Sequence, residues 1–266
     1  MEPLLRWAGS KRRLLSRIKA YLPSNFTRYV EPFAGSACMF FDIEPTRALI
    51  GDLNSELIAT YRIVRHDHNA VAQRLAGLGR SRNYYYYLRA LQPRDLMPVD
   101  RAARFIYLNR FCFNGLYRTN SKGDFNVPFG RDHTGVLPSE EQLGRIAIQL
   151  RAATLRNCSF EKLLPDVAPG DVVYMDPPYS VARRRIFREY TDAAFNATHL
   201  RILRQWMDRL TANGILFILS YADSSEGRVL AQGYKCEIVA TRRNIAGFTS
   251  KRRIAREVII TNRNRV

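Results

Sequence analysis

The segment Asp176-Pro177-Pro178-Tyr179 combines a carboxylate, a stiff backbone and an aromatic ring. It follows residues 171–175, a short apolar run that stops at two prolines and is typical of a buried parallel strand. Open α/β sheets bind their ligands at the carboxyl ends of such strands. The four residues therefore stand where a reacting group could be held.

These residue types suit the methylation of an exocyclic amine on a base. The lone pair of adenine N6 is delocalised into the ring, so the amine is a poor nucleophile until it is held and polarised. The Asp176 carboxylate can accept one N–H and the Pro177 carbonyl the other, because consecutive prolines offer no competing N–H. Tyr179 can stack on a base taken out of the duplex. The same tetrapeptide also fits a plain strand-ending turn.

Three further segments have the residue types of a nucleotide-binding site. Residues 31–37 follow an expected strand and contain Gly35, and a glycine turn lets the backbone approach a ligand closely. Asp52 ends the next expected strand, where a carboxylate commonly holds ribose hydroxyls. The N-terminal run 7–11 places an aromatic residue and a lysine around a glycine. Each segment taken alone also fits a structural turn.

The charge of the chain points to a polyanion as partner. In 266 residues, 42 Lys+Arg stand against 24 Asp+Glu, which leaves a net charge of +18. Such an excess favours nucleic acid, although a basic surface can also serve solubility alone. Arginine outnumbers lysine, which suits forked contacts to phosphates and guanine edges.

Other classes of protein find no support in the sequence. No stretch approaches the roughly 18 apolar residues of a membrane helix, and no apolar segment of a secretory signal follows the first residues. We therefore expect a cytoplasmic protein. The four cysteines are scattered and the four histidines form no ligand set, so neither a disulfide framework nor a metal site is expected.

The positions of the expected elements predict an α/β fold with a doubly wound, mostly parallel sheet. A helix is expected from Thr198 as N-cap, with a 3.6-residue apolar stripe and Gly214 at its carboxyl end. Alternation of strands with helices implies such a sheet. The expected strands lie at 29–33, 48–52, 171–176, 215–219 and 257–261.

The middle of the chain has a different pattern, helical and poor in strands. Asp100 could cap one helix, and Ser139 with Gln142 forms a capping box that opens another. Residues 114–138 between them are rich in Gly, Asn, Arg and Pro and indicate a loop or hairpin. We expect a catalytic domain of residues 1–57 and 151–266, and an inserted helical domain of residues 58–150.

Taken together, these segments resemble the Dam family of DNA adenine-N6 methyltransferases, the D12 class or alpha group. Its motif order places a target-recognition insert between the half that binds S-adenosylmethionine and the catalytic half. The match spans nearly the whole chain in the family's order. The matching segments are residues 3–11, 30–36, 52–58, 107–111, 114–118, 125–130 and 174–179.

The resemblance implies a role for each matching residue. The catalytic tetrapeptide is Asp176, Pro177, Pro178 and Tyr179. S-adenosylmethionine is the implied cofactor, without a metal. The positions that match its binding site are Trp7, Lys11, Glu31, Phe33, Gly35, Asp52 and Asp176. Double-stranded DNA is the implied partner of a monomeric enzyme, and the positions that match the DNA-binding site are Arg6, Leu116, Arg118 and Pro128.

The implied target is GATC, with Arg118 suited to a bidentate guanine contact. Two positions depart from the family pattern: Ala37 stands where the loop carries a second glycine, and Ser10 where the N-terminal motif reads W-A-G-G-K. Both residues are small, so we expect cofactor binding to survive.

Several alternatives stay open at this stage. Methylation of cytosine N4, RNA adenine or protein glutamine is one, although SPPY more often accompanies cytosine N4 and NPPY the RNA and glutamine enzymes. A DNA-binding protein that has lost catalysis is another. Two further features could contact nucleic acid, or could be ordinary packing residues and solvated loops. Residues 84–87 form a tyrosine run beside Asn83 as expected helix cap, and the basic runs lie at 183–185, 242–243 and 251–253.

Overall fold

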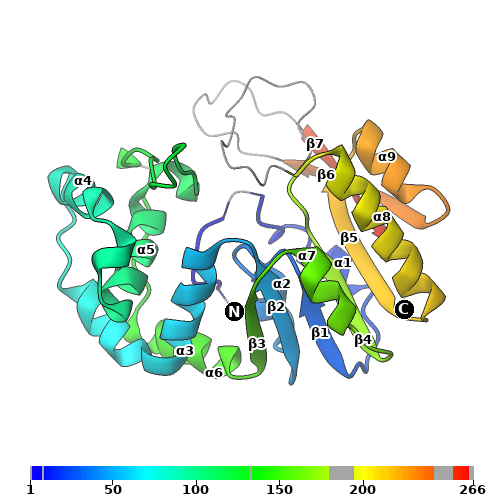
Figure 1. The fold of residues 1–266 in the computed structure, drawn as a ribbon, viewed down its shortest axis with the longest axis horizontal. Helices are drawn as coiled ribbons and strands as arrows, with labels where there is room; N and C mark the ends of the chain where they lie inside the picture. The colour runs from blue at the N-terminus through cyan, green and yellow to red at the C-terminus, as the bar shows by residue number, and fades with distance from the viewer. Residues whose placement is uncertain (1, 8, 132–133, 180–194, 243–253, 264–266) are drawn as a thin grey trace.

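The fold is organised around one seven-stranded sheet (Figure 1). The computed structural model describes residues 2–7, 9–131, 134–179, 195–242 and 254–263. The strand order is β3-β2-β1-β4-β5-β7-β6. The strands are β1 (Arg28–Glu31), β2 (Ala48–Asp52), β3 (Ala153–Asn157), β4 (Asp171–Met175), β5 (Leu216–Ala222), β6 (Lys235–Arg242) and β7 (Ile254–Thr261).

Among the described strands, only β7 runs opposite to the others. β1 pairs in parallel with β2 on one side and with β4 on the other, and β7 pairs antiparallel with both β5 and β6. The strand order reverses between β1 and β4, and this is where doubly wound sheets open a crevice at their carboxyl ends. The predicted fold class is therefore confirmed, and Asp176 follows β4 at this switch point.

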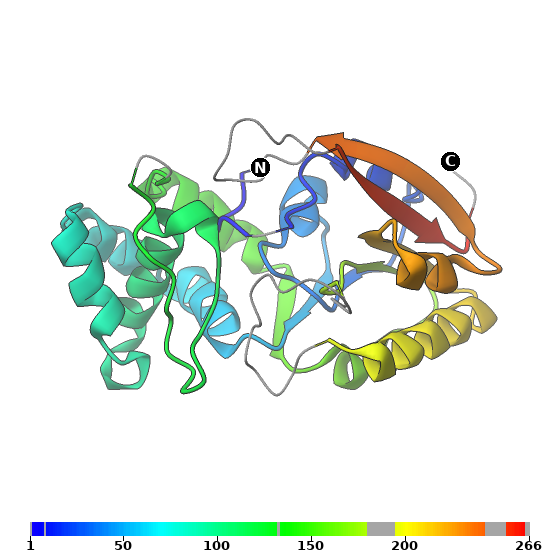
Figure 2. The same cartoon turned by 90° about the horizontal axis from the view of Figure 1, so that it is seen from above.

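Helices cover both faces of the sheet because its strands are apolar on both sides. In the alternation along β1, Tyr29 packs with α1 and α2 and Val30 with the opposite layer. On the first face lie α1 (Leu15–Lys19), α2 (Cys38–Ile43) and part of the helical insert. On the second lie α7 (Phe160–Leu163), with the 3-10 turn η4 (Leu164–Asp166), α8 (Ala197–Ala212) and α9 (Ser225–Ala231). Figure 2 shows the two layers from above.

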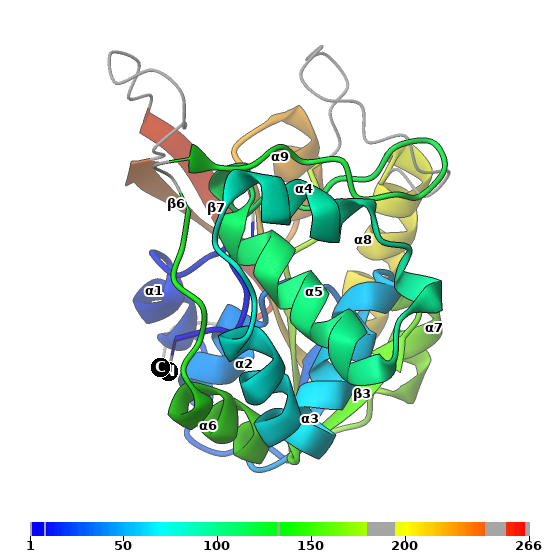
Figure 3. The same ribbon diagram turned by 90° about the vertical axis from the view of Figure 1, so that its left-hand side faces the viewer.

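The insert is a set of helices beside the sheet, on the left in Figures 1 and 2 and facing the viewer in Figure 3. Its elements are α3 (Ser55–Ala76), α4 (Arg82–Ala90), η1 (Pro93–Asp95), α5 (Pro98–Phe111), η2 (Phe113–Gly115) and α6 (Glu140–Leu150). The long α3 packs against α5 and α6, and it kinks at Asp67, whose φ is −143°.

The irregular segment between α5 and α6 forms a loop folded back on itself. Isolated bridges join Cys112 to Phe129 and Thr119 to Phe125 in antiparallel fashion. The sequence prediction of a loop or hairpin here is confirmed.

The division into a catalytic domain and an insert at 57/58 and 150/151 stays a prediction. α3 begins at Ser55 and runs across the first of these boundaries. A single apolar cluster joins Ile50 of the sheet, Tyr61 of α3 and Ile106 of α5. The insert and the sheet therefore share one core along α3. None of the described helices has both the length and the apolar character to cross a membrane.

The predicted strands are confirmed within about three residues at their ends, but some details were wrong. β3 and β6 were not predicted. Asn196, not Thr198, caps α8, and its side chain accepts the Thr198 N–H at 2.9 Å. Ser81 rather than Asn83 caps α4.

The predicted cap at Asp100 was also wrong, because α5 begins earlier, at Pro98 after Met97. Asp100 instead forms an ion pair with Arg74 of α3. The Ser139 cap is confirmed: its Oγ accepts the Gln142 N–H at 3.1 Å.

Candidate active site

Asp176 lies directly after β4, and two donors converge on one of its oxygens. Lys11 Nζ is 2.7 Å from Oδ1, and Ser220 Oγ donates to the same Oδ1 at 3.0 Å. Burial raises the pKa of the Asp176 carboxyl above its ordinary value, while Lys11 and Ser220 act in the opposite direction. Both donors favour the charged form, which is the form that accepts hydrogen bonds.

Lys11 is a buried cation held by several oxygens. Besides Asp176, its ammonium donates to Tyr179 Oη at 3.0 Å and to the Gly9 carbonyl at 3.1 Å, and it lies 3.6 Å from Glu257 Oε2. Burial opposes its charge, but Asp176, Tyr179 and Glu257 outweigh burial, and the pKa of Lys11 is raised. Lys11 is therefore protonated at neutral pH and fixes the positions of the groups around it.

Tyr179, four residues after the end of β4, completes this cluster. Its ring meets that of Tyr221 edge to face, with centroids 5.1 Å apart, and Lys11 Nζ lies 5.1 Å from the Tyr179 ring centroid. Burial raises the pKa of Tyr179 to about 12, so the phenol is neutral. Of the two prolines before it, Pro177 is buried and Pro178 exposed.

The turn after β1 brings a glycine against an indole ring. Gly35 has a φ of +47°, and a Cβ added to it would lie 2.8 Å from Trp7 Cδ1, so only glycine fits there. Its carbonyl accepts the Tyr61 hydroxyl at 2.9 Å. Glu31, at the end of β1, accepts the Tyr29 hydroxyl at 3.0 Å, and burial raises the pKa of Glu31 well above its ordinary value.

Asp52 ties this turn to the end of β2. Its Oδ2 accepts the Gly35 N–H at 2.9 Å and its Oδ1 accepts the Asn54 N–H at 2.8 Å. Burial raises the pKa of Asp52, and these two hydrogen bonds oppose the rise. Phe33, in the same turn, packs on Phe160 at a centroid distance of 5.2 Å.

The two departures from the family pattern lie in these turns. Ala37 precedes α2 in the left-handed region, with φ 49° and ψ 36°, a conformation that is cheap for glycine but not for alanine. Ser36 Oγ donates to Ser10 Oγ at 3.5 Å, so Ser10 links the N-terminal turn to the turn after β1.

The residues predicted to contact DNA lie in or beside the loop after α5. The Arg118 guanidinium donates to Asn126 Oδ1 at 2.6 Å. Leu116 and Arg6 are half-buried, and Pro128 is exposed while its carbonyl accepts the Phe113 N–H at 2.9 Å. Arg6 is next to this loop, because a Cβ on Gly115 would collide with that of Arg6.

α5 of the insert holds the N-terminal segment in place. Asn109 Oδ1 accepts the Arg6 N–H at 2.8 Å, and Asn109 Nδ2 donates to the Arg6 carbonyl at 2.6 Å. Arg110 Nη2 donates to the carbonyls of Leu4 and Pro3 at 2.6 and 3.1 Å. The segment that carries Trp7 and Lys11 to the sheet is thus fixed by the insert.

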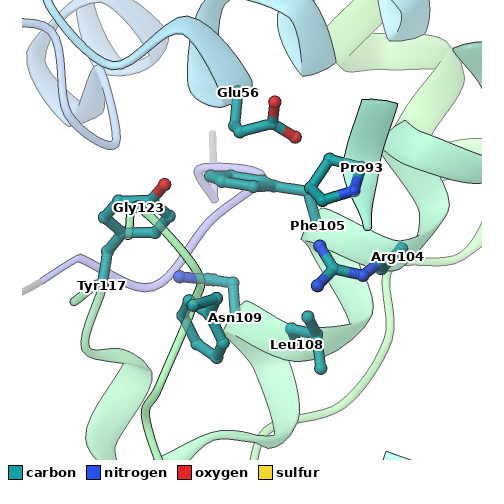
Figure 4. A pocket seen from close by; sticks show the side chains of 9 residues that line it. Glu56, Pro93, Arg104, Phe105, Leu108, Asn109, Tyr117 and Gly123 are labelled. Carbon is teal, nitrogen blue, oxygen red and sulfur yellow. The ribbon is translucent and has the colours of Figure 1, made fainter. Parts of the chain in front are cut away.

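An aromatic contact continues this connection. Trp7 stacks on Tyr117 of the loop, with centroids 5.8 Å apart and planes 14° from parallel. Figure 4 shows Tyr117 and Asn109 on the wall of a small pocket between α5 and the start of α3, where Glu56, Arg104 and Phe105 also contribute. Trp7 therefore contacts both the insert and Gly35.

The structure brings together the predicted catalytic and cofactor-binding residues at adjoining ends of β1, β2 and β4. Sequence reasoning missed Ser220 and Glu257, which reach Asp176 and Lys11 from β5 and β7. Their only sequence signal is a polar residue inside an apolar strand. Within the described part of the chain, no group of three or more His, Cys, Asp or Glu residues is arranged to hold a metal ion.

Among the other candidates, the tyrosine run lies on α4. Tyr85 is buried and Tyr87 is 59% exposed, so the run is divided between the core and the surface. The basic runs 183–185 and 251–253 lie outside the described residues, as does residue 243 of the pair 242–243.

Comparison with known proteins gives one consistent family. Residues 7–245 match the model of the D12 class N6 adenine-specific DNA methyltransferase. A Type II methyltransferase, M1.LlaDCHI of Lactococcus lactis subsp. cremoris, is 35% identical, covering 98% of this chain and 95% of its own length. The DNA adenine methylase of Salmonella typhi is 34% identical, covering 96% and 93%. That of Haemophilus influenzae is 31% identical, covering 97% and 92%.

Proposed function

The chain belongs to the D12 class of N6 adenine-specific DNA methyltransferases, and on that premise we propose that it methylates a flipped adenine within GATC in duplex DNA. The observation that carries the proposal is the convergence of Lys11 and Ser220 on one oxygen of Asp176 at the sheet's switch point. That arrangement supports Asp176 as the group that accepts a hydrogen bond from the reacting amine.

S-adenosylmethionine fits the residues at the ends of β1 and β2. The chemistry of these residues suits a nucleoside ligand: the carboxylates of Glu31 and Asp52 stand at the two strand ends, and Gly35 lets the turn between them lie close against the Trp7 indole. Trp7, Lys11, Glu31, Phe33, Gly35, Asp52 and Asp176 would hold the cofactor. Bound there, it would supply an electrophilic methyl group, with the neutral thioether as leaving group.

The chain's own residues prepare the amine for attack. Asp176 and the Pro177 carbonyl each accept one N–H of adenine N6, which holds the amine and increases its electron density. Tyr179 stacks on the flipped base, and as a neutral phenol it adds no charge to the site. After the N–C bond forms, the extra proton on nitrogen leaves to water. Catalysis rests on positioning and electrostatic complementarity.

We assign sequence reading to the insert. Arg118 would contact guanine through two hydrogen bonds, with Leu116 and Pro128 beside it, and Arg6 would touch DNA near the reacting base. The net charge of +18 supports binding to the phosphates of DNA. The proposed enzyme acts as a monomer.

The proposal is tested by sequencing DNA from cells that lack adenine methylation of their own and express this chain. We expect N6-methyladenine within GATC. A different short motif would keep adenine methylation and overturn the assignment of the target. If DNA stays unmodified while the purified protein binds S-adenosylmethionine, the proposed substrate is wrong, and RNA is the next substrate to assay.

A further inference from the structure

Two buried side chains connect the interior of the sheet to Asp176. Tyr174, on β4, and Ser220, on β5, are 1% and 0% exposed. Tyr174 Oη lies 3.0 Å from Ser220 Oγ, and Ser220 Oγ lies 3.0 Å from Asp176 Oδ1. Because β4 and β5 are paired in parallel with Tyr174 opposite Ile218, all three side chains emerge on the same face of the sheet.

The direction of the hydrogen bonds follows from the chemistry of the groups. An ionised carboxylate only accepts, so the single hydroxyl hydrogen of Ser220 points to Asp176. Ser220 Oγ must then accept the hydrogen of Tyr174. The tyrosine thereby polarises the serine hydroxyl and strengthens the bond that the serine donates.

We propose that Ser220, supported by Tyr174, is a positioning residue that turns the Asp176 carboxylate so that Oδ2 faces the amine. The inference deepens the proposed function and rests on it. Lys11 and Ser220 both bind Oδ1, and within the described residues no donor contacts Oδ2. Two donors on one oxygen fix the rotation of the carboxylate, which a single lysine on a flexible stem would not do.

Several charged or titratable groups surround Asp176 and contribute to its pKa. Lys11 lies on the N-terminal segment, Glu31 on β1, Tyr174 on β4 and Glu257 on β7, and Tyr179 follows β4. Of these groups, only Tyr174 bonds Ser220 directly, so Ser220→Ala removes its partner as well. Tyr174→Phe, which keeps the bond from Ser220 to Asp176, separates the two effects on the titration of Asp176.

The first test is the titration of Asp176 in the protein without ligands, by NMR of 13C-labelled aspartate carboxyls, with Asp176→Asn to assign the signal. Ser220→Ala removes a donor to the charged form. The pKa of Asp176 should rise by about one unit relative to the wild-type protein. An unchanged pKa of Asp176 would overturn the proposal.

The second test is single-turnover methylation of a duplex with one target site, so that product release does not limit the rate. Ser220→Ala should lower the rate about tenfold at neutral pH, and the acid limb of the rate profile should move to higher pH. Ser220→Thr, which keeps the hydroxyl, should restore the acid limb. A uniform loss of rate at all pH values would point to a structural role instead.

Two matched variants keep the tests decisive. Tyr174→Phe removes the tyrosine hydroxyl that bonds Ser220 and keeps the bond from Ser220 to Asp176. It should raise the pKa of Asp176 by less than Ser220→Ala does. This variant takes the place of Ser220→Ala if the latter fails to fold. Thr261→Val removes another fully buried hydroxyl of the same sheet, one that donates to the Phe217 carbonyl. It should cost stability without moving the pKa of Asp176, and an equal shift there would contradict the proposal.

Different results would contradict the proposed function and the role of Ser220. If wild-type protein does not methylate DNA, the proposed function is wrong whatever the NMR titration shows. If the wild-type protein is active and Ser220→Ala matches it in rate and pH profile, only the role of Ser220 is wrong.

Discussion

The cluster around Asp176 and the loop after α5 differ in the origin of the groups that hold them. In the cluster, charged and hydroxyl groups from the N-terminal segment, β5 and β7 meet around Asp176 and Lys11. The loop combines local contacts, such as that of Arg118 with Asn126, with hydrogen bonds that Tyr85 and Arg89 of α4 donate to the Val127 carbonyl. One region depends on strands across the sheet, and the other on itself and on the neighbouring α4.

This difference matches what each region has to do. A reacting carboxylate must be held within a fraction of an ångström, and strands of a sheet can do that. A reading loop can change the side chains that face a partner without disturbing the core, because loops lie at the surface of the fold. The connection between the two is narrow: Asn109 and Arg110 bind the N-terminal segment, and Trp7 stacks on Tyr117.

The sharpest way to separate the two regions is Asp176→Ala. Methylation should fall by about a thousandfold or more, because the hydrogen bond to the amine is lost. Affinity for target DNA, measured by fluorescence anisotropy, should stay within a few-fold of wild type. An equal loss of methylation and of DNA affinity would show that the cluster also binds DNA, so the two regions would not have separate roles.

Asn109→Ala tests the connection between the regions. It removes both side-chain hydrogen bonds to the Arg6 backbone, so the free energy of unfolding should fall by about 3 kcal/mol, as measured by urea denaturation. Affinity for S-adenosylmethionine should weaken as well, because Trp7 and Lys11 follow Arg6. The control is Arg62→Ala, which removes an exposed side chain of α3 that donates to the Leu155 carbonyl of β3. If Arg62→Ala lowers the affinity for S-adenosylmethionine as much as Asn109→Ala does, the effect is not specific to the N-terminal segment.

Arg118→Ala tests the independence of the loop. The preference for the correct base at one position should weaken by about 1–3 kcal/mol, as measured by methylation rates on a set of single-substituted duplexes. On duplexes that already lack the contacted base, the methylation rate of the variant should stay close to that of the wild-type protein. A uniform weakening on every duplex would make Arg118 a phosphate contact.

Ala37→Gly tests local strain in the turn beside the cluster. Ala37 has a left-handed backbone, so glycine should stabilise the protein by about 1 kcal/mol in thermal unfolding. The gain is the smallest of these effects, because the buried methyl group is lost at the same time. A clear loss of stability would mean that the packing of this methyl outweighs the strain.

The central strands of the sheet could be predicted from the sequence better than its edge strands. β1, β2 and β4 are continuous apolar runs, which is the pattern of strands covered on both faces. β3 and β6 lie at the two edges of the sheet and mix polar with apolar residues, so their pattern resembles a loop. Helix ends depended on competing caps: Asn196 and Thr198 both have capping side chains, and only geometry distinguishes them.

The predicted site has the same division. Asp176, Gly35 and Asp52 stand at strand ends in motifs that can be read locally. Ser220 and Glu257 join the site only because β5 and β7 are neighbours in the sheet, which no spacing along the chain reveals. Local chemistry was visible in the sequence, and its distant support was not.

The hold of α5 on the N-terminal segment also limits how specificity could be exchanged between relatives. A chimera that transplants only residues 58–150 would separate Asn109 and Arg110 from the backbone of Pro3, Leu4 and Arg6 to which they are fitted. The recombination unit that keeps these contacts is discontinuous. It joins the first residues of the chain to the insert, so a new reading module would have to bring its own N-terminal segment with it.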